Sequence, residues 1–397
     1  MARTIVFCAD GTWNGPGQSA SDDGPVQTTN VYKLFANLDG EITAETATLP
    51  NEQEKVLRDG GGAVVQWAKY LHGVGNSHNF LVYLLGGTLG AGLIARIVRG
   101  YTFISRNYAA GDRIVIVGFS RGAYTARALA GFINAKGLLD PAKSDLSDKN
   151  NAYRLGTAAW FAYRRGTVTP DLDLLGRVET LVGGVAGLLS GHVSDQLFLK
   201  ANIDTVAVWD TVGALGIPDL NLKQGRIDDF QFADRVLSAN VSRGFHAISV
   251  DERRSDFTPT LWDADLRVEQ VLFPGSHADV GGGNPLDNME SGLSDCALAW
   301  MMEKLSPLVT YAQPGSHAPV PSPTATAHQP WLDAPWNLLV RSTRTFPSGL
   351  SLSKCLLARR QAALVQSAPK ALPSPYNPEN LASYFDGTNP AAGIQVV

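Results

Sequence analysis

The chain has 397 residues, of which 44% are hydrophobic and 18% are charged, and its formal net charge is −4. This length suits one large α/β domain with insertions, or two domains, and the composition is ordinary for a globular protein. No basic excess or Lys/Arg tract is present to neutralise phosphates, so the composition argues against nucleic acid as a partner. The three cysteines lie far apart without a C-x-x-C pair, which implies neither a zinc site nor a disulfide framework.

The first residues have the pattern of a strand. The apolar run Thr4–Cys8 follows only Met-Ala-Arg, which is too short and wrongly flanked for a secretory signal. We therefore expect a cytoplasmic protein, unless a signal-independent machine exports it after folding.

Short apolar runs then alternate with helical patterns. Strands are predicted at Thr4–Cys8, Val64–Tyr70, Arg113–Val117, Thr205–Trp209 and Val268–Phe273, and helices at Leu89–Asn107, Ala123–Asn134, Phe232–Ala247 and Leu293–Lys304. Continuous apolar strands are typical of central strands that are covered on both faces. The alternation predicts an α/β fold with a mostly parallel central sheet flanked by helices.

Two apolar, glycine-containing stretches need separate interpretation. Phe80–Ala95 carries no charge and is near the lower length limit for a membrane span, but it continues into Arg96 and Arg99 as an amphipathic helix would. We expect a glycine-rich loop that leads into a buried helix. Leu181–Leu189 is too short to span a bilayer, and is a candidate lid or membrane-touching surface.

The spacing of the elements predicts four parts. Residues 1–137 form the first part of the core, residues 138–202 an insertion or cap, and residues 203–304 the second part of the core. Residues 305–397 are expected to be a Pro-rich linker and a tail with one helix at Ser353–Val365.

The most informative motif is Gly118-Phe119-Ser120-Arg121-Gly122. It lies directly between the strand Arg113–Val117 and the helix Ala123–Asn134. In a G-x-S-x-G turn of this kind the serine hydroxyl is exposed above the end of the sheet, beside the helix N-terminus. The pattern predicts that Ser120 is a nucleophile, and the alternative is a small residue required for packing in a tight turn.

A serine nucleophile needs a base and an orienting acid, which follow it in the order acid, then histidine, on this type of scaffold. Asp210 directly follows the strand Thr205–Trp209. His277 follows the strand Val268–Phe273 and precedes the glycine run at residues 281–283. These two are the predicted acid and base, although each is also a common loop residue.

The other histidines fit less well. His246 is the second choice, but it falls inside a predicted helix, which favours a structural role. His72 and His78 precede the serine, and His317 and His328 fall in the Pro-rich region.

The oxyanion hole is expected to use the backbone N–H of Arg121, the residue after the nucleophile. A second donor is predicted from the loop after the first strand, at Gly11 or Thr12. The glycine-rich loop His72–Gly75 is an alternative source.

Five segments together resemble a known family. They are Phe7–Asn14 (FCADGTWN), Gly73–Gly75 (GVG), Gly118–Arg127 (GFSRGAYTAR), Val208–Gly216 (VWDTVGALG) and His277–Gly283 (HADVGGG). In this order they are similar to signature blocks of a bacterial and fungal α/β-hydrolase-like family, long of unknown function, which includes the catalytic parts of type VI secretion phospholipase effectors. The resemblance covers roughly residues 3 to 283.

The resemblance implies an α/β-hydrolase-like fold with Ser120, Asp210 and His277 as nucleophile, acid and base. It implies hydrolysis of glycerophospholipid esters without a metal or cofactor. The partners to expect are then a lipid or other ester substrate, peripheral contact with a membrane, and a secretion-system adaptor or immunity protein.

Three alternatives remain open at this stage. The enzyme acts on soluble acyl esters instead of lipids, or the fold is a non-catalytic binding module with a decayed site. In the third, Asp10, Asp210, His277 and Asp279 converge on a cation, although their spacing matches no recognised metal motif.

Overall fold

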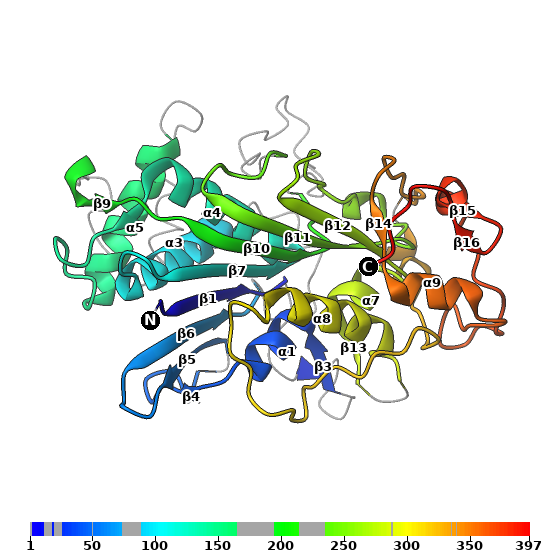
Figure 1. The fold of residues 1–397 in the computed structure, drawn as a ribbon, viewed down its shortest axis with the longest axis horizontal. Helices are drawn as coiled ribbons and strands as arrows, with labels where there is room; N and C mark the ends of the chain where they lie inside the picture. Colours follow the sequence, from blue (N-terminus) through cyan, green and yellow to red (C-terminus); the bar gives the residue numbers. More distant parts are fainter. Residues whose placement is uncertain are drawn as a thin grey trace.

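The computed structural model describes residues 2–11, 18–19, 26–49, 51–73, 89–164, 194–213, 235–286, 289–334, 336–338 and 340–397. Its centre is a nine-stranded sheet with the order β14-β12-β11-β10-β7-β1-β6-β5-β4 (Figure 1). All neighbours from β14 to β6 are parallel, and β5 and β4 continue the sheet as antiparallel strands.

The strands of this sheet are β1 (Thr4–Ala9), β4 (Glu41–Ile42), β5 (Glu52–Arg58), β6 (Val64–Leu71), β7 (Arg113–Phe119), β10 (Ile203–Trp209), β11 (Val241–Ser249), β12 (Val268–Phe273) and β14 (Ser351–Leu352). All five predicted strands are present. The apolar runs of β1, β7 and β10 place buried side chains on both faces of the sheet, and both faces are covered.

Strand β1 shows how the two faces are filled. Ile5 and Phe7 point into one hydrophobic cluster, whereas Val6 and Cys8 point into the other, because successive side chains of a strand alternate. The first cluster includes Leu129 from a helix of one layer, and the second belongs to helices of the opposite layer.

The helices form these two layers (Figure 1). On one face lie α3 (Leu89–Asn107), α4 (Arg121–Lys136) and α5 (Lys149–Arg164), and on the other lie α1 (Asn30–Asn37), α7 (His277–Gly281) and α8 (Gly292–Leu305), with α9 (Lys354–Gln361) near the C-terminal edge. A mostly parallel sheet with a helical layer on each side confirms the predicted α/β-hydrolase-like class.

Smaller elements decorate this frame. They are the strands β2 (Gln18–Ser19), β3 (Val26–Thr29), β8 (Leu138–Leu139), β9 (Phe198–Leu199), β13 (Gly282–Pro285), β15 (Phe385–Asp386) and β16 (Asn389–Pro390), and the 3-10 helices η1 (Asp195–Leu197), η4 (Ser255–Phe257), η5 (Pro330–Leu332), η6 (Trp336–Leu338) and η7 (Glu379–Tyr384).

The strand order reverses at β1. Its neighbour on one side is β6, whereas the chain later returns to its other side and continues through β7, β10, β11 and β12. Crevices form at the carboxyl ends of the strands at such a switch point, because the connections on either side leave in opposite directions. Asp10 and Ser120 follow β1 and β7 directly, so they lie at this point.

The helix predicted over residues 232–247 is wrong in its described part. Residues 241–249 form strand β11, which pairs in parallel with β10 and with β12. The apolar spacing of this segment also fits a helix, but the segment lies between two neighbouring strands of the sheet. Pairing on both sides outweighs a weak local preference.

The segment after α4 begins as part of the core. In α5, the Trp160 ring meets the Phe132 ring of α4 edge to face at 5.4 Å between centroids.

The helix predicted at Leu89–Asn107 is present as α3, and its Ile97 is fully buried. The rest of Phe80–Ala95 before α3, and the patch Leu181–Leu189, lie outside the described residues.

The tail after α8 is bound to the sheet. Strand β14 pairs with β12, and Val397 exchanges backbone hydrogen bonds with Leu352 (2.9 Å) and Lys354 (2.8 Å). The predicted tail helix is present as α9, which Ser353 caps by accepting from Leu356 N–H. Among the described helices, none is both long enough and apolar enough to cross a membrane.

Candidate active site

Ser120 occupies a strained turn between β7 and α4. Its φ of 56° and ψ of −122° lie in a region that side-chain-bearing residues rarely adopt. The strain is enforced from both sides: a Cβ on Gly122 would lie 2.1 Å from Ala9 O, and one on Gly118 would lie 2.3 Å from Gly122 O. Only glycines allow strand and helix to approach this closely, which explains the spacing of the motif.

Asp210 directly follows β10, the strand beside β7, and is fully buried. Its Oδ2 accepts from His277 Nδ1–H at 2.5 Å, and its Oδ1 accepts from Ser249 N–H at 2.9 Å. Burial alone would raise the pKa of Asp210, but the Arg344 guanidinium and the His277 hydrogen bond outweigh it and hold that pKa well below its usual range.

His277 is the first residue of α7, and three neighbours fix its ring. The ring packs against Phe119 at 4.5 Å and against Phe257 at 5.0 Å between centroids, and Asp210 accepts from Nδ1. Burial lowers the pKa of His277 below 6.5, although Asp210 acts in the opposite direction. The imidazole is therefore neutral near pH 7 and carries its proton on Nδ1, which leaves Nε2 as the basic nitrogen.

The structure thus brings the three predicted residues to one edge of the sheet. Asp210 and His277 are hydrogen-bonded, and Phe119 connects His277 to the turn that carries Ser120. The turn and the acid loop also share a backbone bond, because Ser120 N–H donates to Trp209 O at 3.1 Å.

Sequence reasoning missed Arg344. Its side chain is only 4% exposed and pairs with both carboxylate oxygens of Asp210, at 2.7 and 2.9 Å. It comes from the tail, 134 positions along the chain from Asp210. No local motif marks this residue, so no signal in a single sequence could have identified it.

A second carboxylate, Glu252, binds the backbone of the base. It accepts from the backbone N–H of His277 (3.2 Å) and forms a buried ion pair with Arg254 (2.8 Å). Arg254 in turn lies over the rings of Phe257 (3.6 Å) and Trp336 (4.7 Å). Glu252 and Arg254 were also not predicted.

The predicted oxyanion donors have different outcomes. Arg121 is the first residue of α4, at the positive end of that helix dipole. The Gly11 N–H instead donates to the Asp10 carboxylate at 2.7 Å, so it is engaged within its own loop. Thr12 lies outside the described residues.

Asp10 organises the loop after β1. Its Oδ2 accepts from Tyr70 (2.6 Å) and Thr29 (2.7 Å), and burial raises its pKa to about 6 despite these bonds. Arg96 of α3 donates to the Asp10 carbonyl. Asp10 is therefore a structural anchor beside the nucleophile turn.

The second-choice histidine, His246, lies in strand β11 and not in a helix. It is fully buried, its Nε2 accepts from Thr211 N–H at 3.1 Å, and burial lowers its pKa to about 3. Its role is to hold the residue after Asp210, in agreement with the structural role expected.

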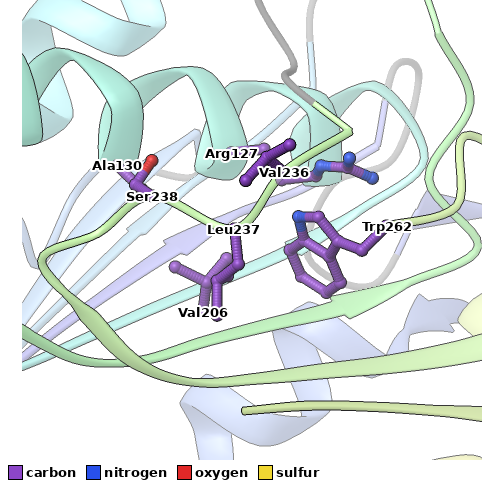
Figure 2. A pocket seen from close by; sticks show the side chains of 7 residues that line it. All are labelled: Arg127, Ala130, Val206, Val236, Leu237, Ser238 and Trp262. Carbon is purple, nitrogen blue, oxygen red and sulfur yellow. The ribbon is translucent and has the colours of Figure 1, made fainter. Parts of the chain in front are cut away.

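Arg127, Leu237 and Trp262 are among the residues that line a small cavity, shown in Figure 2. Trp262 meets the His246 ring edge to face at 5.8 Å, and Arg127 of α4 lies over Trp262 at 4.5 Å from its ring centre. The cavity measures about 10 Å³, room for a single water molecule at most. It has no space for a substrate.

A larger cleft is lined partly by Gly213, three residues after Asp210. It measures about 630 Å³ and is bordered by Gly213, Thr258, Leu261 and Pro347, among others. Thr258 adjoins Phe257, which packs on His277. Its size lies within the range of ligand pockets.

The remaining histidines serve other partners. His317 packs edge to face on Tyr32, and His328 bonds to Asp279 and Glu290. Burial lowers the pKa of His72 to about 4. His78 lies outside the described residues.

The four groups considered for a cation do not form one donor set. Asp10 and Asp279 are each saturated by protein donors of their own, whereas Asp210 and His277 bond to each other. Within the described parts of the chain, no group of three or more His, Cys, Asp or Glu residues has a metal-binding arrangement.

Comparison with known proteins gives one extended family match. The sequence model described as type VI secretion system (T6SS), phospholipase effector Tle1-like, catalytic domain matches residues 3–304. The uncharacterized protein YEL023C of Saccharomyces cerevisiae is 26% identical over 255 residues, which are 64% of this chain and 32% of that protein. The chain thus spans about a third of this curated relative.

Solved structures with a similar fold are more distant. An uncharacterized protein from Pseudomonas aeruginosa is 17% identical with a TM-score of 0.42, over 84% of this chain and 48% of that one. The Tle1 effector bound to the VgrG spike is 17% identical with a TM-score of 0.37, over 72% of this chain and 53% of that one. Esterase 2 of Thermogutta terrifontis is 13% identical with a TM-score of 0.34, over 79% and 85% of the two chains.

Proposed function

Since the chain belongs to the Tle1-like T6SS phospholipase effectors, with their catalytic domain at residues 3–304, we propose that it is a serine hydrolase of glycerophospholipid acyl esters. Ser120 is the nucleophile, His277 the general base and Asp210 the orienting acid. The observation that carries the proposal is the 2.5 Å bond between His277 Nδ1 and Asp210, beside a serine in a strained strand-to-helix turn.

The chemistry follows from this arrangement. His277 Nε2 takes the Ser120 hydroxyl proton as Oγ attacks the acyl carbonyl, and Asp210 stabilises the imidazolium that forms. The imidazolium returns that proton to the leaving lysolipid alcohol, which leaves the acyl group on Ser120. Water, deprotonated by His277, then releases the fatty acid and restores the serine.

The tetrahedral intermediates carry a negative charge on the former carbonyl oxygen. We assign one stabilising donor to the backbone N–H of Arg121, at the N-terminus of α4, where the helix dipole favours an anion. The predicted sources of the second donor stay the loop after β1, where the Gly11 N–H already donates to Asp10, and the loop at residues 72–75. No metal or cofactor takes part in this mechanism.

An apolar segment beside the base supports a lipid as the substrate. Leu332, Leu338 and Val340 are 51%, 85% and 73% exposed, within nine residues of the tail. Trp336 of the same segment packs on Phe257 at 5.4 Å, and Phe257 packs on His277. Exposed aliphatic side chains around a tryptophan are suited to a membrane interface.

The first test compares wild type with Ser120→Ala. We expect wild type to release fatty acid from phosphatidylethanolamine–phosphatidylglycerol vesicles, and the variant to lose about 10³-fold or more of that rate. A fluorophosphonate probe should label wild type and not the variant, with circular dichroism showing that both are folded. A folded wild type that neither hydrolyses an ester nor takes the label would favour the non-catalytic binding module.

The substrate class needs a second comparison. Leu338→Ser should lower vesicle hydrolysis severalfold and leave hydrolysis of soluble p-nitrophenyl butyrate unchanged, because only the vesicle reaction needs the apolar segment. Leu372→Ser, at an 88% exposed leucine elsewhere in the tail, is the matched control. Turnover of soluble esters alone would move the proposal to a soluble acyl ester.

Family membership also bears on location and partners. We propose delivery through type VI secretion, with a secretion-system adaptor or an immunity protein as partner and peripheral contact with the target membrane. The test is loss of delivery to a target cell when the secretion apparatus is inactivated.

A further inference from the structure

Arg344 lies beyond the residues that the family model matches, yet it contacts the core of the site. We propose that Arg344 is a positioning residue that fixes the Asp210 carboxylate and adjusts the basicity of His277 through its charge. The inference rests on the proposed function, since it assigns Asp210 and His277 the roles of acid and base.

The four terminal N–H groups of Arg344 are all used. Two pair with Asp210, at 2.7 Å to Oδ1 and 2.9 Å to Oδ2. The other two donate to the carbonyls of Ser249 (2.7 Å) and Phe257. Arg344 Nε is buried without an acceptor among the described residues, so these four bonds alone hold the guanidinium.

These contacts join the three segments that build the acid–base pair. Asp210 follows β10, Ser249 ends β11, and Phe257 packs on the His277 ring. A planar guanidinium can hold a carboxylate in a fixed plane with two parallel bonds, which an ammonium group cannot do. Arg344 therefore fixes the direction in which Asp210 presents Oδ2 to His277.

Among the described residues, few charged groups face the pair. Asp210 faces Arg344, His277 and His246, and His277 faces Asp210, Glu252 and Arg254. Glu252 and Arg254 neutralise each other in a buried pair at 2.8 Å. Arg344 is therefore the cation that offsets the negative charge of Asp210.

This offset predicts the direction in which the acidic limb of the activity profile moves when Arg344 is replaced. With Arg344 present, the Asp210 charge stabilises an imidazolium at His277 less than an isolated carboxylate would, so His277 remains a free base to lower pH. Without Arg344, either the imidazolium is stabilised more or the buried Asp210 takes up a proton more readily. Both changes move the acidic limb of the activity profile to higher pH.

The experiment measures kcat/KM for p-nitrophenyl butyrate between pH 5 and pH 9, with fluorophosphonate labelling rates over the same range. Arg344→Met should move the acidic limb up by about one pH unit or more. Its kcat at the plateau should fall about tenfold with little change in KM, since geometry at the base is disturbed and not substrate binding. Arg344→Lys should keep the acidic limb of wild type, because it keeps the charge, and should still lose kcat.

The matched control is Arg359→Met. Arg359 is a buried arginine of the same tail that donates to the carbonyls of Pro323, Ala325 and Gln366 and does not contact the site. It should lower the melting temperature without moving the acidic limb.

The outcomes separate the two proposals. An Arg344→Met variant that is destabilised like the control but keeps the acidic limb of wild type would overturn the inference and leave the proposed function intact. If Arg344→Met does not fold, an Arg344→Lys variant with the kcat of wild type would overturn it equally. A folded wild type without hydrolysis or labelling would overturn the proposed function, and the inference with it.

Discussion

His277 and Asp279 of α7 each belong to an Asp–His pair, and the two pairs differ in the group that completes each one. In the first, His277 donates to Asp210 at 2.5 Å, and in the second, His328 donates to Asp279 at 2.6 Å. Arg344 completes the first pair by binding the acid. Glu290 completes the second by binding the other nitrogen of the histidine, at 3.1 Å.

The groups around each pair determine the protonation state of its histidine. Burial lowers the pKa of His277 and leaves its ring neutral near pH 7, although Asp210 acts in the opposite direction. Burial also disfavours the charged form of His328, but Asp279 and Glu290 outweigh it and raise its pKa. With carboxylates on both nitrogens, His328 is a charged cross-link between the tail and α7, whereas His277 keeps a nitrogen for chemistry.

The largest expected effect separates the two histidines by activity. His277→Gln should lower kcat/KM for a soluble ester by about 10³-fold or more, because the serine loses its base. His328→Gln should retain activity within about fivefold, because its ring binds Asp279 and Glu290 and has no part in the chemistry.

Fluorophosphonate labelling and melting temperatures should accompany the rates. Equal losses in both variants, with both folded, would contradict the division of roles and make His328 a candidate base. Loss of labelling only in His277→Gln would support it.

Much of this site follows from local sequence. Ser120, Asp210 and His277 each come directly after, or shortly after, a predicted strand with an apolar end, and the carboxyl ends of parallel strands meet at one edge. The glycines around Ser120 report a close backbone approach that any chain of this fold must allow. These features are encoded within a few residues of the site.

The rest depends on contacts between distant segments. Arg344 reaches Asp210 across 134 positions and His328 reaches Asp279 across 49, and neither has a neighbouring motif. The Pro-rich region was predicted as a linker because its composition lacks a helical or strand period, yet it supplies His328 to the core. Strand β11 was mistaken for a helix because its neighbours β10 and β12, not its own spacing, determine it.

A smaller effect should appear in stability when the acid of the second pair is changed. Asp279 accepts from Ser276 N–H, Ser276 Oγ–H, Asn284 and His328, and its side chain is fully buried. Asp279→Asn places an amide among these donors and should cost about 3 kcal/mol in the free energy of unfolding.

Urea denaturation followed by tryptophan fluorescence measures this cost. Asp333→Asn, at an exposed aspartate of the same tail, should change the free energy by about 0.5 kcal/mol or less. Equal stability of the two variants would mean that the second pair does not link the tail to α7.

The smallest expected effect is a difference between the two pairs in how the stability of the fold depends on pH. A raised folded-state pKa means that protonated His328 stabilises the fold fully below its unfolded value near 6.5, and that this contribution is lost as pH rises through the folded value. His277 has a lowered pKa, so its contribution has the opposite sign: stability falls as pH drops below 6.5, because the unfolded chain binds that proton first.

Glu290→Gln isolates the His328 contribution, because it removes one of the two carboxylates that raise this pKa. The variant should melt about 2 °C or less below wild type at pH 6, and the difference should shrink as pH rises through the folded-state pKa of His328. Glu303→Gln, at an exposed glutamate of α8, should show no such trend. A difference that stays constant from pH 6 to pH 9 would mean that Glu290 binds a neutral His328, and the two pairs would then differ in geometry but not in charge.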